Sequence, residues 1–186
     1  MVEITALGTG TVVMMTVLVA GIFLWLTQHR HSAALLGVAT AGGLVLNSLL
    51  KLGFARPRPV IIDWGVTAMS SSFPSGHAMN AVIVYGTVAY LAARLQTRHG
   101  VRVLTLSVAA LIILLVCGSR LYLGVHYPSD VLAGLTIGLA WAAFCMATLE
   151  ALQLYAKRNA PEMLRVEHPA PKDQAAAAPA SASTTS

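Results

Sequence analysis

Two histidines and one aspartate in this sequence have the types and spacing of a nucleophilic site. His126 and Asp130 are four residues apart, so they share a face if the chain is helical there or turns into a helix. A carboxylate beside an imidazole fixes its tautomer and stabilises its cationic form, which leaves the opposite nitrogen free to attack. His77 follows a Pro-Ser-Gly turn and lies at the mouth of an anion site predicted at the helix start that this turn forms. Taken alone, each feature also fits a structural histidine or a helix-cap pair.

Four cations occupy the same polar segments, namely Lys51, Arg56, Arg58 and Arg120. Arginine offers a planar fork that matches phosphate oxygens, and lysine adds a point charge. Ser75 and Gly76 allow close backbone approach where a helix starts, and free N–H groups at a helix start bind anions. Each feature also has a structural interpretation. The cations can extend to the membrane interface, and the Ser75–Gly76 turn can be an ordinary helix cap. Together the features favour a phosphoryl group as the electrophile, because cations and N–H groups stabilise its transition state.

The sequence lacks histidines, cysteines and carboxylates at the spacing of a zinc site. No group of histidine, cysteine and carboxylate residues has the spacing of a zinc site, and no CxxC occurs. The two cysteines, Cys117 and Cys145, lie inside apolar runs and are interpreted as small apolar side chains. The spacing therefore gives no sign of a zinc site, and we expect no cofactor.

The rest of the chain has the composition of a membrane protein. Its 186 residues are 56% hydrophobic and 10% charged, with mean hydropathy +0.72, whereas soluble domains carry about a quarter charged residues. Five continuously apolar segments approach the roughly 20 residues that cross a bilayer as a helix, and they predict an all-α, polytopic transmembrane bundle. These segments cover about residues 4–27, 32–50, 76–95, 101–118 and 131–152. The first segment is too long for a signal peptide and lacks a positive n-region.

The arrangement of charge predicts how the chain crosses the membrane. We expect a transmembrane domain over residues 1–155 and a disordered cytoplasmic tail over 156–186, rich in Ala, Ser and Pro. With five helices, four of the 12 Lys and Arg residues lie on the side of the polar segments and eight on the other side. The side with eight should be cytoplasmic, so the polar segments and the N-terminus should face outward. This distribution argues against a nucleic-acid partner and favours a bacterial inner membrane protein with an extracytoplasmic site.

The three polar segments together resemble a known signature. The pattern KxxxxxxRP, then PSGH, then SRxxxxxHxxxD is similar to that of the type 2 phosphatidic acid phosphatase superfamily, over about residues 46–152. The resemblance implies that His126 attacks phosphorus and forms a phosphohistidine, that Asp130 orients it, and that His77 protonates the leaving group. It also implies that no metal takes part. The groups expected to hold the phosphoryl oxygens are Lys51, Arg58, Arg120 and the Ser75–Gly76 backbone.

Arg56 lies outside the shared pattern, and its two interpretations are a contact to a second phosphate and an anchor at the interface. Membrane members similar to this sequence commonly have six spans. With five here, the chain is either a short form or begins downstream of a first helix.

The resemblance implies an integral membrane lipid phosphatase. Its substrate would be a phosphate monoester or diphosphate of the phosphatidate, phosphatidylglycerol phosphate or polyprenyl diphosphate class. The expected partners are this lipid and the bilayer, and the oligomeric state stays open. One alternative is a lipid phosphotransferase that uses the same site with an acceptor other than water. Another is a lipid-binding bundle without catalysis, which the presence of His77, His126 and Asp130 argues against.

Overall fold

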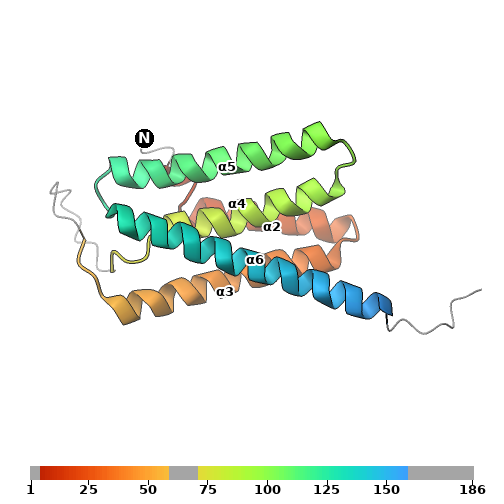
Figure 1. Cartoon of the computed structure of the whole chain (residues 1–186), viewed down its shortest axis with the longest axis horizontal. Helices are drawn as coiled ribbons and strands as arrows, with labels where there is room; N and C mark the ends of the chain where they lie inside the picture. The colour runs from red at the N-terminus through yellow and green to blue at the C-terminus, as the bar shows by residue number, and fades with distance from the viewer. Residues whose placement is uncertain (1–4, 59–70, 159–186) are drawn as a thin grey trace, which may run out of the picture.

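The chain folds into a bundle of antiparallel helices, seen in a computed structural model that describes residues 5–58 and 71–158. Within these residues the helices are α2 (Gly10–Leu26), α3 (Arg30–Phe54), α4 (Gly76–Leu95), α5 (His99–Tyr122) and α6 (Pro128–Arg158). Successive helices run in opposite directions, so the chain crosses the bundle repeatedly (Figure 1). The predicted all-α bundle is confirmed.

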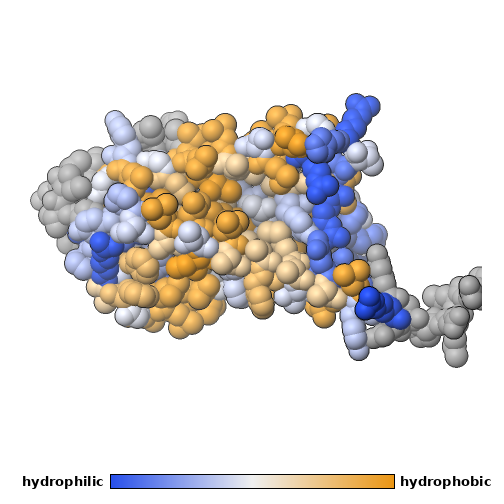
Figure 2. Space-filling view, in the orientation of Figure 1, coloured by the Kyte–Doolittle hydropathy of each residue, from blue (hydrophilic) through white to orange (hydrophobic). Residues whose placement is uncertain are grey.

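Four of these helices, α3 to α6, are long and apolar enough to cross a membrane by length and composition. The fifth, α2, is apolar but has 17 residues, at the lower limit for a span. Large apolar side chains face outward, as with Leu104, which is 63% exposed. On the face drawn in Figure 2, apolar residues cover much of the middle of the molecule and hydrophilic residues lie towards both ends. This surface is the inverse of a soluble protein's, so the chain is an integral membrane protein.

The helix boundaries differ from the predicted segments mostly at the ends. α4 covers the predicted 76–95, whereas α2 begins at Gly10 rather than near residue 4. Thr9 precedes α2 in an extended conformation, after a turn in which the N–H of Gly8 donates to the carbonyl of Thr5 at 3.0 Å. α6 continues to Arg158, three residues past the expected domain boundary. The predicted tail beyond Arg158 lies outside the described residues.

α4 is the central helix and packs against α2, α3, α5 and α6. Two glycines of α6 let it approach α4 closely. A Cβ at Gly134 would lie 2.6 Å from the carbonyl oxygen of Ser75, and a Cβ at Gly138 would lie 3.0 Å from that of Met79. This close approach places the start of α4 directly beside the start of α6.

The ends of α3 and α5 and the starts of α4 and α6 meet at one end of the bundle (Figure 1). All three polar segments singled out from the sequence therefore meet at that end. The other end carries a separate group of cations, and hydrophilic side chains gather there in Figure 2. Its described arginines are Arg30, Arg94, Arg98, Arg102 and Arg158.

Candidate active site

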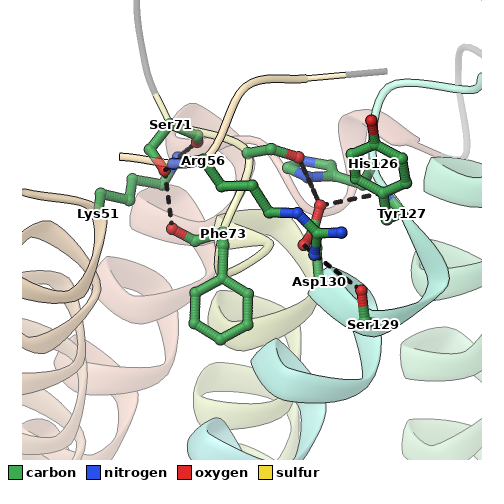
Figure 3. A network of polar contacts seen from close by, with 9 residues as sticks. Lys51, Arg56, Ser71, Phe73, His126, Tyr127, Ser129 and Asp130 are labelled. Atoms are coloured by element: carbon green, nitrogen blue, oxygen red, sulfur yellow. Dashed lines mark hydrogen bonds and ion pairs between the residues drawn. The ribbon is translucent and has the colours of Figure 1, made fainter. Parts of the chain in front are cut away.

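The carboxylate of Asp130 is the most densely bonded group at the polar end of the bundle (Figure 3). Asp130 is fully buried in the first turn of α6, where a negative charge suits the helix dipole. Its Oδ1 accepts from Nη1 of Arg56 at 2.7 Å. Its Oδ2 accepts from Oγ of Ser72 at 2.5 Å and from the backbone N–H of Tyr127 at 3.0 Å. Both oxygens are therefore held by donors of the protein itself.

His126 lies between α5 and α6 and is 5% exposed. The turn that carries it needs Gly124, whose φ of 62° is in the left-handed region. The Nδ1 atom of His126 is 3.7 Å from Oδ2 of Asp130 and 3.4 Å from Oγ of Ser72. The first distance is longer than a hydrogen bond. The predicted carboxylate–imidazole pair is thus adjacent but not directly hydrogen-bonded.

The charge state of His126 follows from its surroundings. Burial lowers its pKa to about 4, with Arg58 and Arg120 acting in the same direction and Asp130 opposing them. The imidazole is therefore neutral near pH 7, which is the form that carries a lone pair for attack.

His77 lies in the first turn of α4, at the same end of the bundle as His126. It is within electrostatic reach of His126, Arg120, Lys51 and Arg58. A Cβ at Gly8 would lie 3.0 Å from Cδ2 of the His77 ring, so the backbone before α2 closes one side of the imidazole. The two predicted histidines therefore belong to one site.

Two buried donors in this site have no hydrogen-bond partner among the described residues, namely Nε of Arg120 and Oγ of Ser75. Arg120 is 8% exposed, and its Nη1 donates to Oγ1 of Thr5 at 2.6 Å. The backbone N–H of Ser75 donates to the carbonyl of Asp130 at 3.0 Å, and Gly76 begins α4. Buried donors without partners are rare in proteins, and an anion at this helix start would satisfy them.

The remaining predicted cations lie around the segment that leads into α4. Nζ of Lys51, in the last turn of α3, donates to the carbonyl of Ser71 at 3.3 Å. Arg58 is half-buried, and its pKa is lowered by burial and raised by the charge of Asp130. The ring of Phe73 packs against that of Phe54, with centroids 4.6 Å apart, which fixes this segment on the end of α3.

The contacts of three residues in the site were not predicted from the sequence. Arg56 pairs with Asp130 and stacks on the Tyr127 ring at 4.2 Å, so its contact is with a carboxylate. Ser72 contacts both His126 and Asp130, and Thr5 accepts from Arg120. The sequence marked Arg56 as a cation of the polar segments, with a second phosphate or the interface as its expected partner, and Ser72 lies within a few residues of predicted site residues. Neither spacing nor residue type identifies their partners.

No group of three His, Cys, Asp or Glu side chains among the described residues is placed to hold a metal ion.

Comparison with known proteins agrees with this architecture. The family model described as the PAP2 superfamily matches residues 32–153. Phosphatidylglycerophosphatase B of Bacillus subtilis is 34% identical over 142 residues, which cover 75% of this chain and 68% of that protein. Undecaprenyl-diphosphatase BcrC of the same organism is 32% identical over 123 residues, which cover 62% of this chain and 58% of that protein.

A solved structure is also similar, that of a transmembrane PAP2 type phosphatidylglycerolphosphate phosphatase from Bacillus subtilis. It superposes with a TM-score of 0.75 at 31% identity and covers 81% of this chain and 75% of that chain. With a family model that spans most of its length and a fold shared with that enzyme, the chain belongs to the PAP2 superfamily.

Proposed function

We propose that this protein is a membrane lipid phosphatase that cleaves a phosphate monoester or diphosphate through a phosphohistidine on His126. One observation carries the proposal. The imidazoles of His77 and His126 lie at the same end of the bundle as two buried donors without a partner among the described residues, Nε of Arg120 and Oγ of Ser75. A phosphoryl group needs a nucleophile, an acid for the leaving oxygen and donors for its other oxygens, and this site contains all three kinds of group.

In the first step, Nε2 of His126 attacks phosphorus while His77 donates a proton to the leaving oxygen. The N–P bond forms as the P–O bond to the lipid breaks, and the lipid leaves as an alcohol or a monophosphate. Lys51, Arg58 and Arg120 hold the non-bridging oxygens, whose negative charge they offset in the transition state.

In the second step, water attacks the phosphohistidine. His77, which lost its proton in the first step, accepts one from this water, and the N–P bond breaks to release phosphate. His126 is then neutral again and ready for another cycle. No cofactor is needed at any point of this scheme.

Two features support a lipid as the substrate. The site lies at one end of an apolar bundle, so a phosphate headgroup can reach it while the acyl or prenyl chains stay in hydrocarbon. The named relatives act on phosphatidylglycerophosphate and undecaprenyl diphosphate. The arginines at the opposite end favour a cytoplasmic location for that end, and we therefore propose an extracytoplasmic site.

The test is phosphate release in detergent from phosphatidate, phosphatidylglycerol phosphate and undecaprenyl diphosphate. The wild-type protein should hydrolyse at least one of them without added metal, and His126→Ala should release none. The matched control is His99→Ala, an exposed histidine at the start of α5, which should keep full activity. Undiminished turnover by His126→Ala, or no turnover of any of the three lipids by the wild type, would refute the proposal. A competing alcohol acceptor in the same assay separates hydrolysis from phosphotransfer.

A further inference from the structure

We propose that Ser72 is a positioning residue that links His126 to Asp130 and keeps the imidazole proton on Nδ1. This inference rests on the proposed function, because it concerns how His126 is prepared to attack. Ser72 is fully buried, and its Oγ lies 2.5 Å from Oδ2 of Asp130 and 3.4 Å from Nδ1 of His126.

No direct hydrogen bond joins His126 to Asp130, and three other groups donate to the carboxylate. Oδ1 accepts from Arg56, and Oδ2 accepts from Ser72 and from the N–H of Tyr127. The separation of 3.7 Å between Nδ1 and Oδ2 is too long for a hydrogen bond. The carboxylate therefore acts on the imidazole through the hydroxyl between them.

The directions of the two hydrogen bonds of Ser72 follow from which groups can donate a proton. An ionised carboxylate only accepts, so the single hydroxyl proton of Ser72 goes to Oδ2 of Asp130. The oxygen of Ser72 can then only accept from Nδ1 of His126, which must carry the proton. In a neutral imidazole with the proton on Nδ1, the lone pair is on Nε2, the atom that attacks phosphorus.

Burial of these three side chains makes the hydroxyl of Ser72 hard to replace. Ser72 and Asp130 are fully buried and His126 is 5% exposed, so bulk water is poorly placed to replace the hydroxyl. When Nε2 bonds to phosphorus, the proton on Nδ1 remains and the ring gains positive charge. The contact through Ser72 connects that charge to the carboxylate, which favours the intermediate. Hydrogen bonds of this kind are often long before substrate binds and shorten afterwards.

The first test reads the tautomer without any substrate. The full-length protein, labelled with ¹⁵N-histidine in detergent at pH 7, should give a His126 signal with Nδ1 protonated and Nε2 unprotonated. The signal is assigned by its loss in His126→Gln. In Ser72→Ala part of the proton population should move to Nε2, because the hydroxyl is lost while the backbone of residue 72 still interacts with the imidazole. The control is Ser71→Ala, which removes a hydroxyl that accepts from the N–H of Arg56 and has no contact with the imidazole, and its tautomer should match the wild type.

The second test is kinetic. Ser72→Ala should lower kcat about 10- to 100-fold, the scale for losing a group that orients a reactive histidine, with KM nearly unchanged. Ser72→Thr keeps the hydroxyl and should recover most of kcat. A purely structural role would instead change KM or folding and would leave the tautomer as it was.

The tautomer and activity measurements distinguish a failure of the Ser72 role from a failure of the proposed function. A wild-type His126 with its proton on Nε2, or a Ser72→Ala variant with unchanged tautomer and kcat, overturns the role of Ser72. A wild-type protein that hydrolyses no lipid phosphate overturns the proposed function, while the tautomer measurement still decides whether Ser72 controls the imidazole. If Ser72→Ala does not fold, the wild-type tautomer and Ser72→Thr kinetics remain decisive.

Discussion

Nη1 of Arg56 lies 2.7 Å from Oδ1 of Asp130, across 74 residues of sequence. The guanidinium also stacks on Tyr127 and donates to Ser129, so one side chain from the segment after α3 fixes the start of α6. A carboxylate with no solvent exposure needs such a partner, because an isolated buried charge is costly. Arg56 is thus a structural partner of the proposed orienting residue.

Replacing Arg56 with alanine should destabilise the protein. Removing one member of a fully buried pair costs about 3–5 kcal/mol, but the Arg56 side chain keeps 38% exposure. We therefore expect the free energy of unfolding to fall by about 1–3 kcal/mol, which would be measured as a lower Tm in detergent. In a double-mutant cycle with Asp130→Asn the two effects should be strongly non-additive. Additive effects, or an Arg56→Ala variant as stable as Arg98→Ala at the other end of the bundle, would show that the pair contributes nothing.

Removing Lys51 or Arg120 should impair phosphate binding in the transition state. Each alanine variant is expected to lower kcat/KM by about 10- to 1,000-fold, the scale for losing one oxyanion donor. Orthovanadate, which mimics the pentacoordinate phosphorus, should inhibit both variants more weakly than the wild type. Arg102→Ala, at the cytoplasmic end in the proposed topology, provides the control. Wild-type kcat/KM and vanadate inhibition in Arg120→Ala would remove this residue from the anion site.

The low pKa of His126 predicts how activity depends on pH. The free imidazole is neutral above about pH 4 and protonated below it, so the acid limb of kcat/KM should fall near pH 4 instead of near 6.5. Arg58→Ala removes a cation that lowers this pKa, so its acid limb should move to higher pH. Asp130→Asn removes the charge that raises the pKa, so its limb should move to lower pH. An acid limb near 6.5 in the wild type, unmoved by either substitution, contradicts this prediction.

The stability of the protein should also depend on pH through His126. The unfolded chain binds a proton at His126 as the pH falls through about 6.5, whereas the folded chain binds it only near 4. Because the unfolded state then holds more protons, stability is lost as the pH falls from about 6.5 to about 4. His126→Gln should reduce the slope of Tm against pH in this window. An identical slope in the two proteins would mean that His126 is not buried in its neutral form.

The close approach of α6 to α4 predicts a steric effect at Gly134. A methyl group there would lie 2.6 Å from the backbone oxygen of Ser75, which cannot rotate away. Gly134→Ala should therefore cost about 1–3 kcal/mol and lower kcat, because it separates Asp130 from the start of α4. Gly86→Ala in α4 is the matched control, since nothing lies within 4 Å of its added methyl, and it should be neutral or stabilising. Similar Tm and kcat for the two variants would rule out a tight contact.

The acid role of His77 is tested by the leaving group. His77→Asn should slow release of a lipid alcohol strongly, but it should slow release of nitrophenol much less, because nitrophenolate leaves without a proton. Rates for the two substrates are compared in the wild type and the variant. An equal loss with both substrates would assign His77 to binding rather than to proton transfer.

The sequence predicted the helices and the meeting of three polar segments at one end, for physical reasons. Apolar runs of about 20 residues leave few other folds in lipid, and alternating helices bring the Lys51, His77 and His126 segments to one end. It could not predict that Arg56 pairs with Asp130, that Ser72 separates His126 from Asp130, or that Thr5 contacts Arg120. These contacts join segments 54 to 115 residues apart, and helix packing alone determines them.

The central claim is that His126 becomes covalently phosphorylated during turnover. Wild-type protein should be mixed with ³²P-labelled lipid phosphate, quenched in alkali within the first turnover, and digested. We expect acid-labile, alkali-stable label on the peptide that contains His126, and none in His126→Ala. Label on a different residue, or hydrolysis by His126→Ala at the wild-type rate, would contradict the account.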